Sequence, residues 1–231
     1  MKYVGIWWEM HIGQKDWSPG PIQGATTERA MQYIDFASQH DIDGVLVEGW
    51  NQGWEGEWWQ RPPTFSFTKP VVGFDIDKVA AYAKAKGVRL IGHHETAAGI
   101  QYYEQQMDDA FKLYQQLGVN QLKVYEQLSL QQFQWLAAAI KETSGLTMAG
   151  HQPWLVPLEH AIADDLKSLE HGRVFLFECS TAIGPYKAQP MREGLINVGV
   201  WQQILESQDA ELCQQKMQLL AASDSWWSPT L

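Results

Sequence analysis

The sequence has no long hydrophobic run, few basic residues and only two cysteines, and each shortage excludes a class of protein. No stretch approaches the roughly 18 apolar residues that a membrane-spanning helix requires. The 17 lysine and arginine residues are scattered and are outnumbered by 27 acidic ones, which argues against nucleic-acid binding because phosphates need clustered positive charge. Met1 and Lys2 lead directly into a strand-like run without a signal peptide, so we expect a cytoplasmic or a recombinantly trimmed protein.

The two cysteines, Cys179 and Cys213, stand alone in the sequence. They have neither the close spacing of metal ligands nor the further cysteines of a disulfide-rich scaffold. The sequence therefore predicts two free thiols, with Cys179 packed as a small apolar group.

Short apolar runs alternate with segments of helical periodicity along all 231 residues. The strand–helix units of the first half span about 40 residues each, which is the period of an eightfold barrel. The alternation predicts an α/β fold of the (β/α)8 TIM-barrel type, formed as one domain over residues 1–231. The strand-like runs are residues 2–10, 44–50, 89–96, 119–125, 146–150, 168–171 and 225–231.

Only seven strands are recognisable, so we expect the barrel to be incomplete or irregularly closed. An open barrel exposes unpaired strand edges, which favour pairing with a second copy of the chain. The sequence therefore also predicts self-association.

Polar residues follow the apolar runs at the carboxyl ends of the predicted strands, where barrel enzymes place their chemistry. Adjacent strand residues point to opposite faces, so only one of His93 and His94 can point into the barrel, and Glu95 shares the face of His93. Imidazole and carboxylate groups together suit zinc or a similar divalent ion. The strand-end residues are Glu9, His11, Glu48, His93, His94, Glu95, Lys123, His151 and His171.

Twelve tryptophans are the most unusual feature of the composition. Trp8 lies in the first predicted strand, Trp50 ends the second, and Trp54 lies in the long loop over residues 51–72 that is broken by prolines. Aromatic rings at such positions are candidates for binding a carbohydrate or another small molecule, together with His93, and core packing is the alternative. Long loops in compact domains are more often functional than structural.

Five segments of the first half stand out as a set: YVGIWWEMHIG (3–13), GATTE (24–28), DGVLVEGWN (43–51), FDID (74–77) and LIGHHET (90–96). Through these segments, residues 1–118 resemble glycoside hydrolase family 97. The resemblance implies a barrel glycosidase acting on α-linked sugars with a calcium ion in its site, and it gives Glu95 the role of a general-base carboxylate. Glu48, on the neighbouring strand, is the second catalytic candidate. The acid glutamate and the strand-four aspartate of the family have no match after Gly118.

Four segments of the second half form another set: LKVY (122–125), MAGHQPW (148–154), SLEH (168–171) and WSPTL (227–231). Through these segments, residues 119–231 resemble metal-dependent amidohydrolases of the imidazolonepropionase and prolidase type. The resemblance implies that Lys123, His151 and His171 are metal ligands, and His11 completes the predicted metal set. The His-x-His of strand one and the aspartate of strand eight in that family have no match here.

The two resemblances meet at residues 117–120, and we interpret the chain as a hybrid of two partial barrels. Three functional hypotheses follow, of which two are enzymes. The first is a hydrolase-derived scaffold without a complete active site. The second is a divalent-metal hydrolase that uses zinc at the predicted metal set. The third is an α-glycosidase that uses Glu95 and the tryptophan-rich loop.

Overall fold

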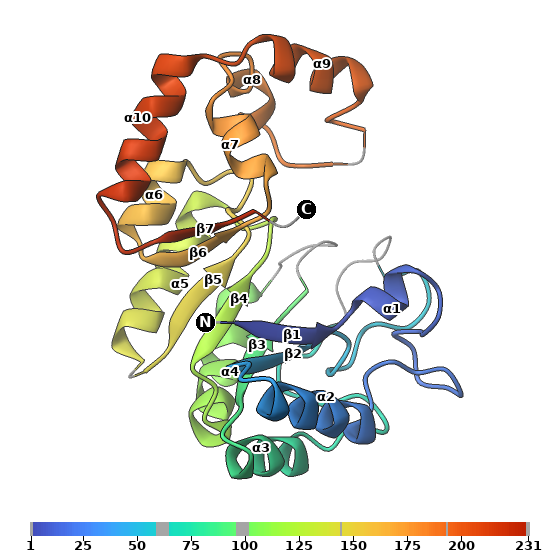
Figure 1. The fold of residues 1–231 in the computed structure, drawn as a ribbon. Coiled ribbons are helices and arrows are strands. Elements are labelled where there is room, and N and C mark those ends of the chain that lie inside the picture. The colour runs from blue at the N-terminus through green and yellow to red at the C-terminus, as the bar shows by residue number, and fades with distance from the viewer. Residues whose placement is uncertain (1, 59–64, 96–101, 144, 193, 230–231) are drawn as a thin grey trace. The chain divides into compact units, whose positions relative to one another are not determined.

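The structure is a computed structural model that describes residues 2–58, 65–95, 102–143, 145–192 and 194–229 (Figure 1). It divides into two compact units, residues 1–123 (unit 1) and 124–231 (unit 2). Seven strands are found in the described residues, at the places where the sequence predicted them. The predicted strand ends at Thr96 and at residues 230–231 lie outside the described residues.

Unit 1 alternates parallel strands with helices. The strands lie in chain order, with Val4 opposite Val45, Val45 opposite Leu90, and Gly92 opposite Leu122. The last residue of the fourth strand already belongs to unit 2. The elements are β1 (Tyr3–Ile6), α1 (Trp8–His11), α2 (Thr27–Gln39), β2 (Gly44–Val47), α3 (Ile76–Ala85), β3 (Arg89–His93), α4 (Tyr103–Leu117) and β4 (Gln121–Val124).

The helices of unit 1 begin and end at residues suited to those positions. The Thr26 side chain accepts a hydrogen bond from the Arg29 amide at the start of α2, and Asp75 accepts one from the Lys78 amide at the start of α3. Gly118 ends α4 with a φ of 69°, a left-handed conformation that glycine adopts without strain.

One predicted boundary is wrong. The sequence predicted that the first strand continues through Glu9 and Met10, but the strand ends at Ile6 and residues 8–11 form α1. The amides of Met10 and His11 donate to the Trp7 carbonyl, so the chain turns helically instead of extending. His11 therefore lies on a short helix and not at a strand end.

The core of unit 1 lies between the helices and one face of the sheet. Alternate strand residues, such as Ile6, Val45 and Val47, pack there against Ile34 and Val79 of the helices. The residues between them in sequence point to the opposite face, because side chains alternate along a strand. We call this opposite surface the helix-free face.

Unit 2 contains three further parallel strands in chain order. A small separate core lies outside this sheet, built from Trp154, Phe177, Ile183, Leu195, Val200 and Ile204. The elements are α5 (Leu130–Glu142), β5 (Thr147–Gly150), α6 (Leu158–Ala163), β6 (Leu166–Glu170), α7 (Arg173–Glu178), α8 (Gly184–Lys187), α9 (Val198–Glu206), α10 (Ala210–Ala221) and β7 (Trp226–Ser228).

The prediction of two free thiols is wrong, because Cys179 and Cys213 form a disulfide. Cys179 ends α7, and Cys213 lies in the first part of α10. Their Cα atoms are 4.5 Å apart although 34 residues separate them in sequence. Spacing along the chain carries no signal for such a contact, since it depends on how the two helices pack.

None of the helices in the described residues is both long and apolar enough to cross a membrane.

Candidate functional site

Lys123 occupies the helix-free face of unit 1 among aromatic rings. Its ammonium donates to the Tyr3 hydroxyl at 3.2 Å and lies 5.6 Å from the ring centroids of both Tyr3 and Trp7. Gly5 makes room for the Trp7 ring, since a Cβ atom at this position would lie 2.2 Å from it. Cation–π contacts of this kind hold the charge of Lys123 in place.

Glu48 lies immediately after β2 in a largely desolvated position. Its amide donates to the Ile6 carbonyl, its side chain is 13% exposed, and its Oε1 accepts a hydrogen bond from the Trp17 indole at 2.9 Å. The Nε2 atom of His11 is 3.7 Å from the same oxygen. Burial raises the pKa of Glu48 to about 7, although the Trp17 N–H and the charge of Lys123 act against this. A carboxyl group that titrates near neutral pH can donate a proton to a substrate.

His93 and His94 point to opposite sides, as the alternation predicted. His94 lies on the helix side, stacked on Phe67 at 3.9 Å between ring centroids and 2.7 Å from the Tyr114 hydroxyl. Gly92 makes room for Tyr114, because a Cβ atom there would lie 2.8 Å from its ring. Burial lowers the pKa of His94 to about 3, so this imidazole is neutral and structural.

His93 faces the other way and stacks on Trp54, with 6.2 Å between ring centroids. Its carbonyl accepts a hydrogen bond from the Trp50 indole at 3.1 Å. Glu95 is buried two residues further on, and alternation places it on the side of His93. Glu48 and Glu95 therefore follow neighbouring strands of the helix-free face.

The predicted aromatic platforms differ in exposure. Trp8 is 64% exposed on α1, whereas Trp50 and Trp54 are buried, and the Trp54 indole donates to Asn51. Trp17 stacks parallel to Trp54 at 6.3 Å and so joins the Glu48 carboxylate to the tryptophan cluster. Sequence reasoning missed Trp17, since nothing in its loop indicated that its N–H reaches a strand end 31 residues away.

Unit 2 holds a second group of titratable side chains. His151 follows β5, Glu170 ends β6 and His171 comes next, and ligand atoms of the three lie within 4.8 Å of one another. The Nε2 atoms of His151 and His171 are 2.7 Å apart. On its other side, His151 Nδ1 lies 2.9 Å from Glu126 Oε1, and Glu126 also pairs with Arg173.

The backbone of His171 explains why Glu170 was missed as a candidate. Consecutive strand residues point to opposite faces, so Glu170 and His171 are not expected to meet. His171 has a φ of 76°, and this left-handed conformation breaks the alternation. A strained residue at a strand end is a frequent mark of a functional position.

The four residues predicted as one metal set divide between the units. His151 and His171 come together in unit 2, where the donor set of two imidazoles and a carboxylate suits zinc. His11 lies beside Glu48 and Lys123 beside Tyr3, both within unit 1. The structure thus supplies Glu170 as the third ligand candidate within unit 2.

A family model described as Glycoside hydrolase 97 matches residues 7–145. The chain belongs to this family. Two solved structures of glycoside hydrolase family 97 from Pseudoalteromonas sp. strain K8, one in complex with acarbose and one of a substituted variant in complex with panose, are each 33% identical to it with a TM-score of 0.64. The match covers 76% of this chain and 30% of each enzyme, so the chain spans about a third of their length.

Similarity of fold extends to other glycosidases. A cyclic α-maltosyl-(1→6)-maltose hydrolase from Arthrobacter globiformis is 10% identical with a TM-score of 0.50, over 94% of this chain and 67% of that one. At such identity the match reports only a shared α/β architecture.

The family match continues past the predicted junction at residues 117–120. The expectation that the resemblance to family 97 ends at Gly118 is therefore wrong, because the matched region includes β4 and α5. That expectation depended on single missing carboxylates, and a family is recognised by its whole pattern of strands and helices. The hybrid origin and the amidohydrolase resemblance remain predictions.

Proposed function

We propose that this chain is an α-glycosidase-type protein whose unit 1 presents Glu48 and Glu95 to an α-linked sugar. Family membership supports the substrate class, as do relatives solved with acarbose and panose. The observation that carries the proposal is Glu48, whose largely desolvated carboxyl group has its pKa raised to about 7 and which lies beside the strand that precedes Glu95.

The two carboxylates suit an inverting reaction. Leu46 pairs with Ile91, so the same register sets Glu48 opposite His93 and Glu95 two residues further along. Strand geometry then separates the two Cα atoms by roughly 8 Å. Inverting glycosidases hold the carboxyl groups themselves about 6.5–9.5 Å apart, which leaves room for a water molecule, and side chains that extend in parallel from this Cα spacing would meet that distance. In this proposal Glu48 protonates the leaving oxygen and Glu95 activates the water.

The calcium ion implied by the family resemblance does not fit the described residues of this face. Calcium takes about six to eight oxygen ligands from carboxylates, carbonyls and water, and its affinity depends on how many of them are charged. Glu48 titrates near neutral pH and already accepts the Trp17 hydrogen bond, so Glu95 is the one remaining carboxylate of the pair. No step of the proposed reaction depends on calcium.

Hydrolysis of a panel of 4-nitrophenyl α-glycosides tests this proposal. Glu48→Gln and Glu95→Gln should each lower turnover by about 100-fold or more, since each removes a proton-transfer group. Glu28→Gln, on an exposed position of α2, is the matched control and should leave turnover unchanged. Equal activity in the Glu95→Gln variant and the unsubstituted chain would contradict the proposal.

We propose as a second function that unit 2 binds a divalent metal ion through His151, Glu170 and His171. Two facing imidazole nitrogens and a carboxylate within 4.8 Å support this site. The Glu126 carboxylate at His151 Nδ1 orients that ring as outer carboxylates orient zinc-bound histidines. A bound zinc ion would supply an activated water for hydrolysis.

Elemental analysis of purified protein dialysed against zinc tests the metal site. We expect about one equivalent of zinc for the unsubstituted chain and for His160→Ala, an exposed histidine on α6. The double variant His151→Ala/His171→Ala should bind none. Equal zinc content in all three proteins would refute the site.

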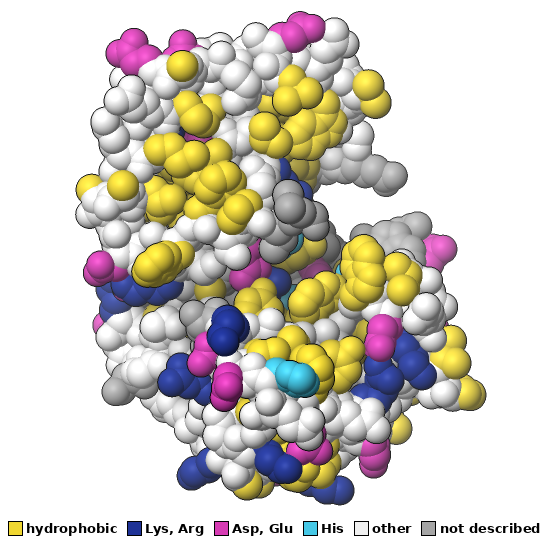
Figure 2. Space-filling model, viewed as in Figure 1, with side chains coloured by type: hydrophobic (Ala, Val, Ile, Leu, Met, Phe, Trp, Pro, Cys, Tyr) yellow, Lys and Arg dark blue, Asp and Glu magenta, His cyan; other side chains and the backbone are white. Residues whose placement is uncertain are grey.

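A third proposal is the hybrid scaffold, which lacks a complete site of either kind and self-associates. Figure 2 shows hydrophobic side chains gathered at the surface of unit 2. Val198, Leu205 and Trp226 are exposed apolar residues of this unit. Light scattering should give a mass above that of one 26.3 kDa chain. Activity with the glycoside panel or stoichiometric zinc would reject the scaffold proposal.

A further inference from the structure

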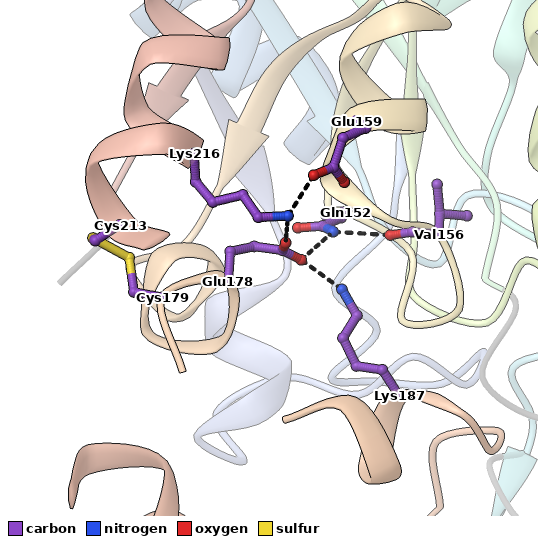
Figure 3. A network of polar contacts seen from close by, with 8 residues as sticks. All are labelled: Gln152, Val156, Glu159, Glu178, Cys179, Lys187, Cys213 and Lys216. Atoms are coloured by element: carbon purple, nitrogen blue, oxygen red, sulfur yellow. Dashed lines mark hydrogen bonds and ion pairs between the residues drawn. A yellow bond between two sulfur atoms is a disulfide. The ribbon is translucent and has the colours of Figure 1, made fainter. Parts of the chain in front are cut away.

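The disulfide and a polar network join the same two helices of unit 2 (Figure 3). Glu178 precedes Cys179 at the end of α7, and Lys216 follows Cys213 by about one turn of α10. The Lys216 ammonium lies 3.2 Å from Glu178 Oε2 and also pairs with Glu159 of α6. The disulfide therefore lies next to the ion pair that connects α10 to its neighbours.

Helix α10 has no fully buried residue. Its half-buried side chains Leu212, Met217, Leu219 and Leu220 supply its apolar contacts, which stabilise less than full burial would. The segment before it is held by backbone contacts, in which the Asp209 amide donates to the Cys179 carbonyl at 2.9 Å. From Cys213 onward, the disulfide is a covalent attachment of the helix and Lys216 an ionic one in the described residues, beside the half-buried Met217, Leu219 and Leu220.

The chain leads from α10 directly into β7, which has three residues and pairs with β6. Two contacts of β7 hold the backbone of His171. The Ser228 carbonyl accepts the His171 amide at 3.0 Å, and the Trp227 indole donates to the His171 carbonyl at 3.1 Å. These bonds hold the left-handed conformation that brings His171 to His151.

We propose that the Cys179–Cys213 disulfide is a redox latch, meaning a reducible bond that holds α10 and β7 in place. Through β7 it keeps the His171 backbone in the conformation that brings His171 to His151. A dithiol reductant would donate two electrons and two protons to the sulfur–sulfur bond, giving two thiols while the reductant forms its own disulfide. α10 then opens more often, β7 follows, and the His171 backbone loses its two partners. The regulatory meaning of the latch rests on the metal site proposed above.

Hydrogen exchange of the metal-free chain, followed by mass spectrometry with and without dithiothreitol, tests the latch independently of metal binding. Reduction should accelerate exchange of α10, β7 and the His171 amide by about tenfold or more, equal to about 1.4 kcal/mol of local stability. Helix α5 of the same unit should change much less.

The chain has only two cysteines, so the double variant Cys179→Ser/Cys213→Ser is a matched control. It should exchange rapidly in α10 and β7 under both conditions and be insensitive to dithiothreitol. Unchanged exchange in the unsubstituted chain after complete reduction, verified by thiol counting, would overturn the proposal. Equal acceleration in α5 and α10 would also overturn it, because the disulfide would then act only on general stability. Failure of zinc binding alone would leave this result unaffected.

Discussion

Each unit of the chain holds a glutamate that is largely removed from solvent, Glu48 in unit 1 and Glu178 in unit 2. The surroundings shift the pKa values of these two carboxyl groups in opposite directions. Burial dominates at Glu48 in unit 1 and raises its pKa to about 7. Burial also opposes the charge of Glu178 in unit 2, but Lys187, Gln152 and Lys216 together outweigh it and lower the pKa. A carboxylate with several partners stabilises a fold, whereas one with few partners is available for proton transfer.

The units also differ in how they gain stability. The core of unit 1 joins both helices and strands, with residues such as Ile34 and Val79 fully buried. The separate core of unit 2 is small, and its residues Ile183, Leu195, Val200 and Ile204 lie between the two disulfide-linked cysteines. Small cores commonly need covalent or ionic reinforcement. Unit 2 has a disulfide beside this core, whereas unit 1 contains no cysteine.

The largest predicted effect is a loss of stability in unit 2, and not in unit 1, when the disulfide is removed. Cys213→Ser should lower the free energy of opening of segment 179–222 by about 3–4 kcal/mol, because a loop of this length loses its constraint in the unfolded chain. Unit 1 should keep its stability. Peptide-resolved hydrogen exchange in increasing urea measures both, and an equal loss in unit 1 would break the comparison.

The second prediction concerns the paired glutamate. Glu178→Gln should destabilise unit 2 by about 3 kcal/mol at pH 7, since two lysines lose their buried partner. The pKa of Glu178 is lowered in the folded state, so the stabilisation is present above its ordinary pKa and is lost as the pH falls below it. The deficit of the variant should shrink in acid, as urea unfolding at several pH values can show. A deficit independent of pH would contradict the ionic account.

The third prediction concerns Glu48, where stability should depend on pH in the opposite direction from that at Glu178. The pKa of Glu48 is raised, so the folded chain holds an extra proton between the ordinary value of 4.5 and about 7. Stability must fall as the pH rises through this window. Glu48→Gln removes the titrating group and should stabilise unit 1 by about 2 kcal/mol at pH 8, with no gain at pH 4. Thermal unfolding at both pH values measures this, and a destabilised variant at pH 8 would refute it.

The smallest predicted effect isolates one hydrogen bond. Trp17→Phe keeps an aromatic ring against Trp54 but removes the donor to Glu48. The pKa of Glu48 should rise further, because the indole N–H favours the charged form. The free energy of unfolding of unit 1 should fall by about 1 kcal/mol, because one hydrogen bond is lost. The free energy of unfolding of unit 1 should therefore continue to fall up to a higher pH than in the unsubstituted chain. An unchanged dependence of this free energy on pH would count against this role of Trp17.

Local patterns in the sequence predicted the strands and the opposite orientations of His93 and His94. Strand alternation is a short-range rule, and it holds on β3 because Gly92 admits Tyr114 on the helix side. The disulfide, the approach of Trp17 to Glu48 and the left-handed backbone of His171 depend on contacts between distant segments. Composition and spacing do not encode such contacts, which is why free thiols were predicted and Glu170 was missed.

A ¹³C NMR titration of the Glu48 carboxyl carbon, assigned with the Glu48→Gln variant, tests the central claim most directly. The account predicts a midpoint near pH 7. A midpoint at the ordinary value of 4.5 would show that the carboxyl group is solvated and would remove the basis for its role as proton donor.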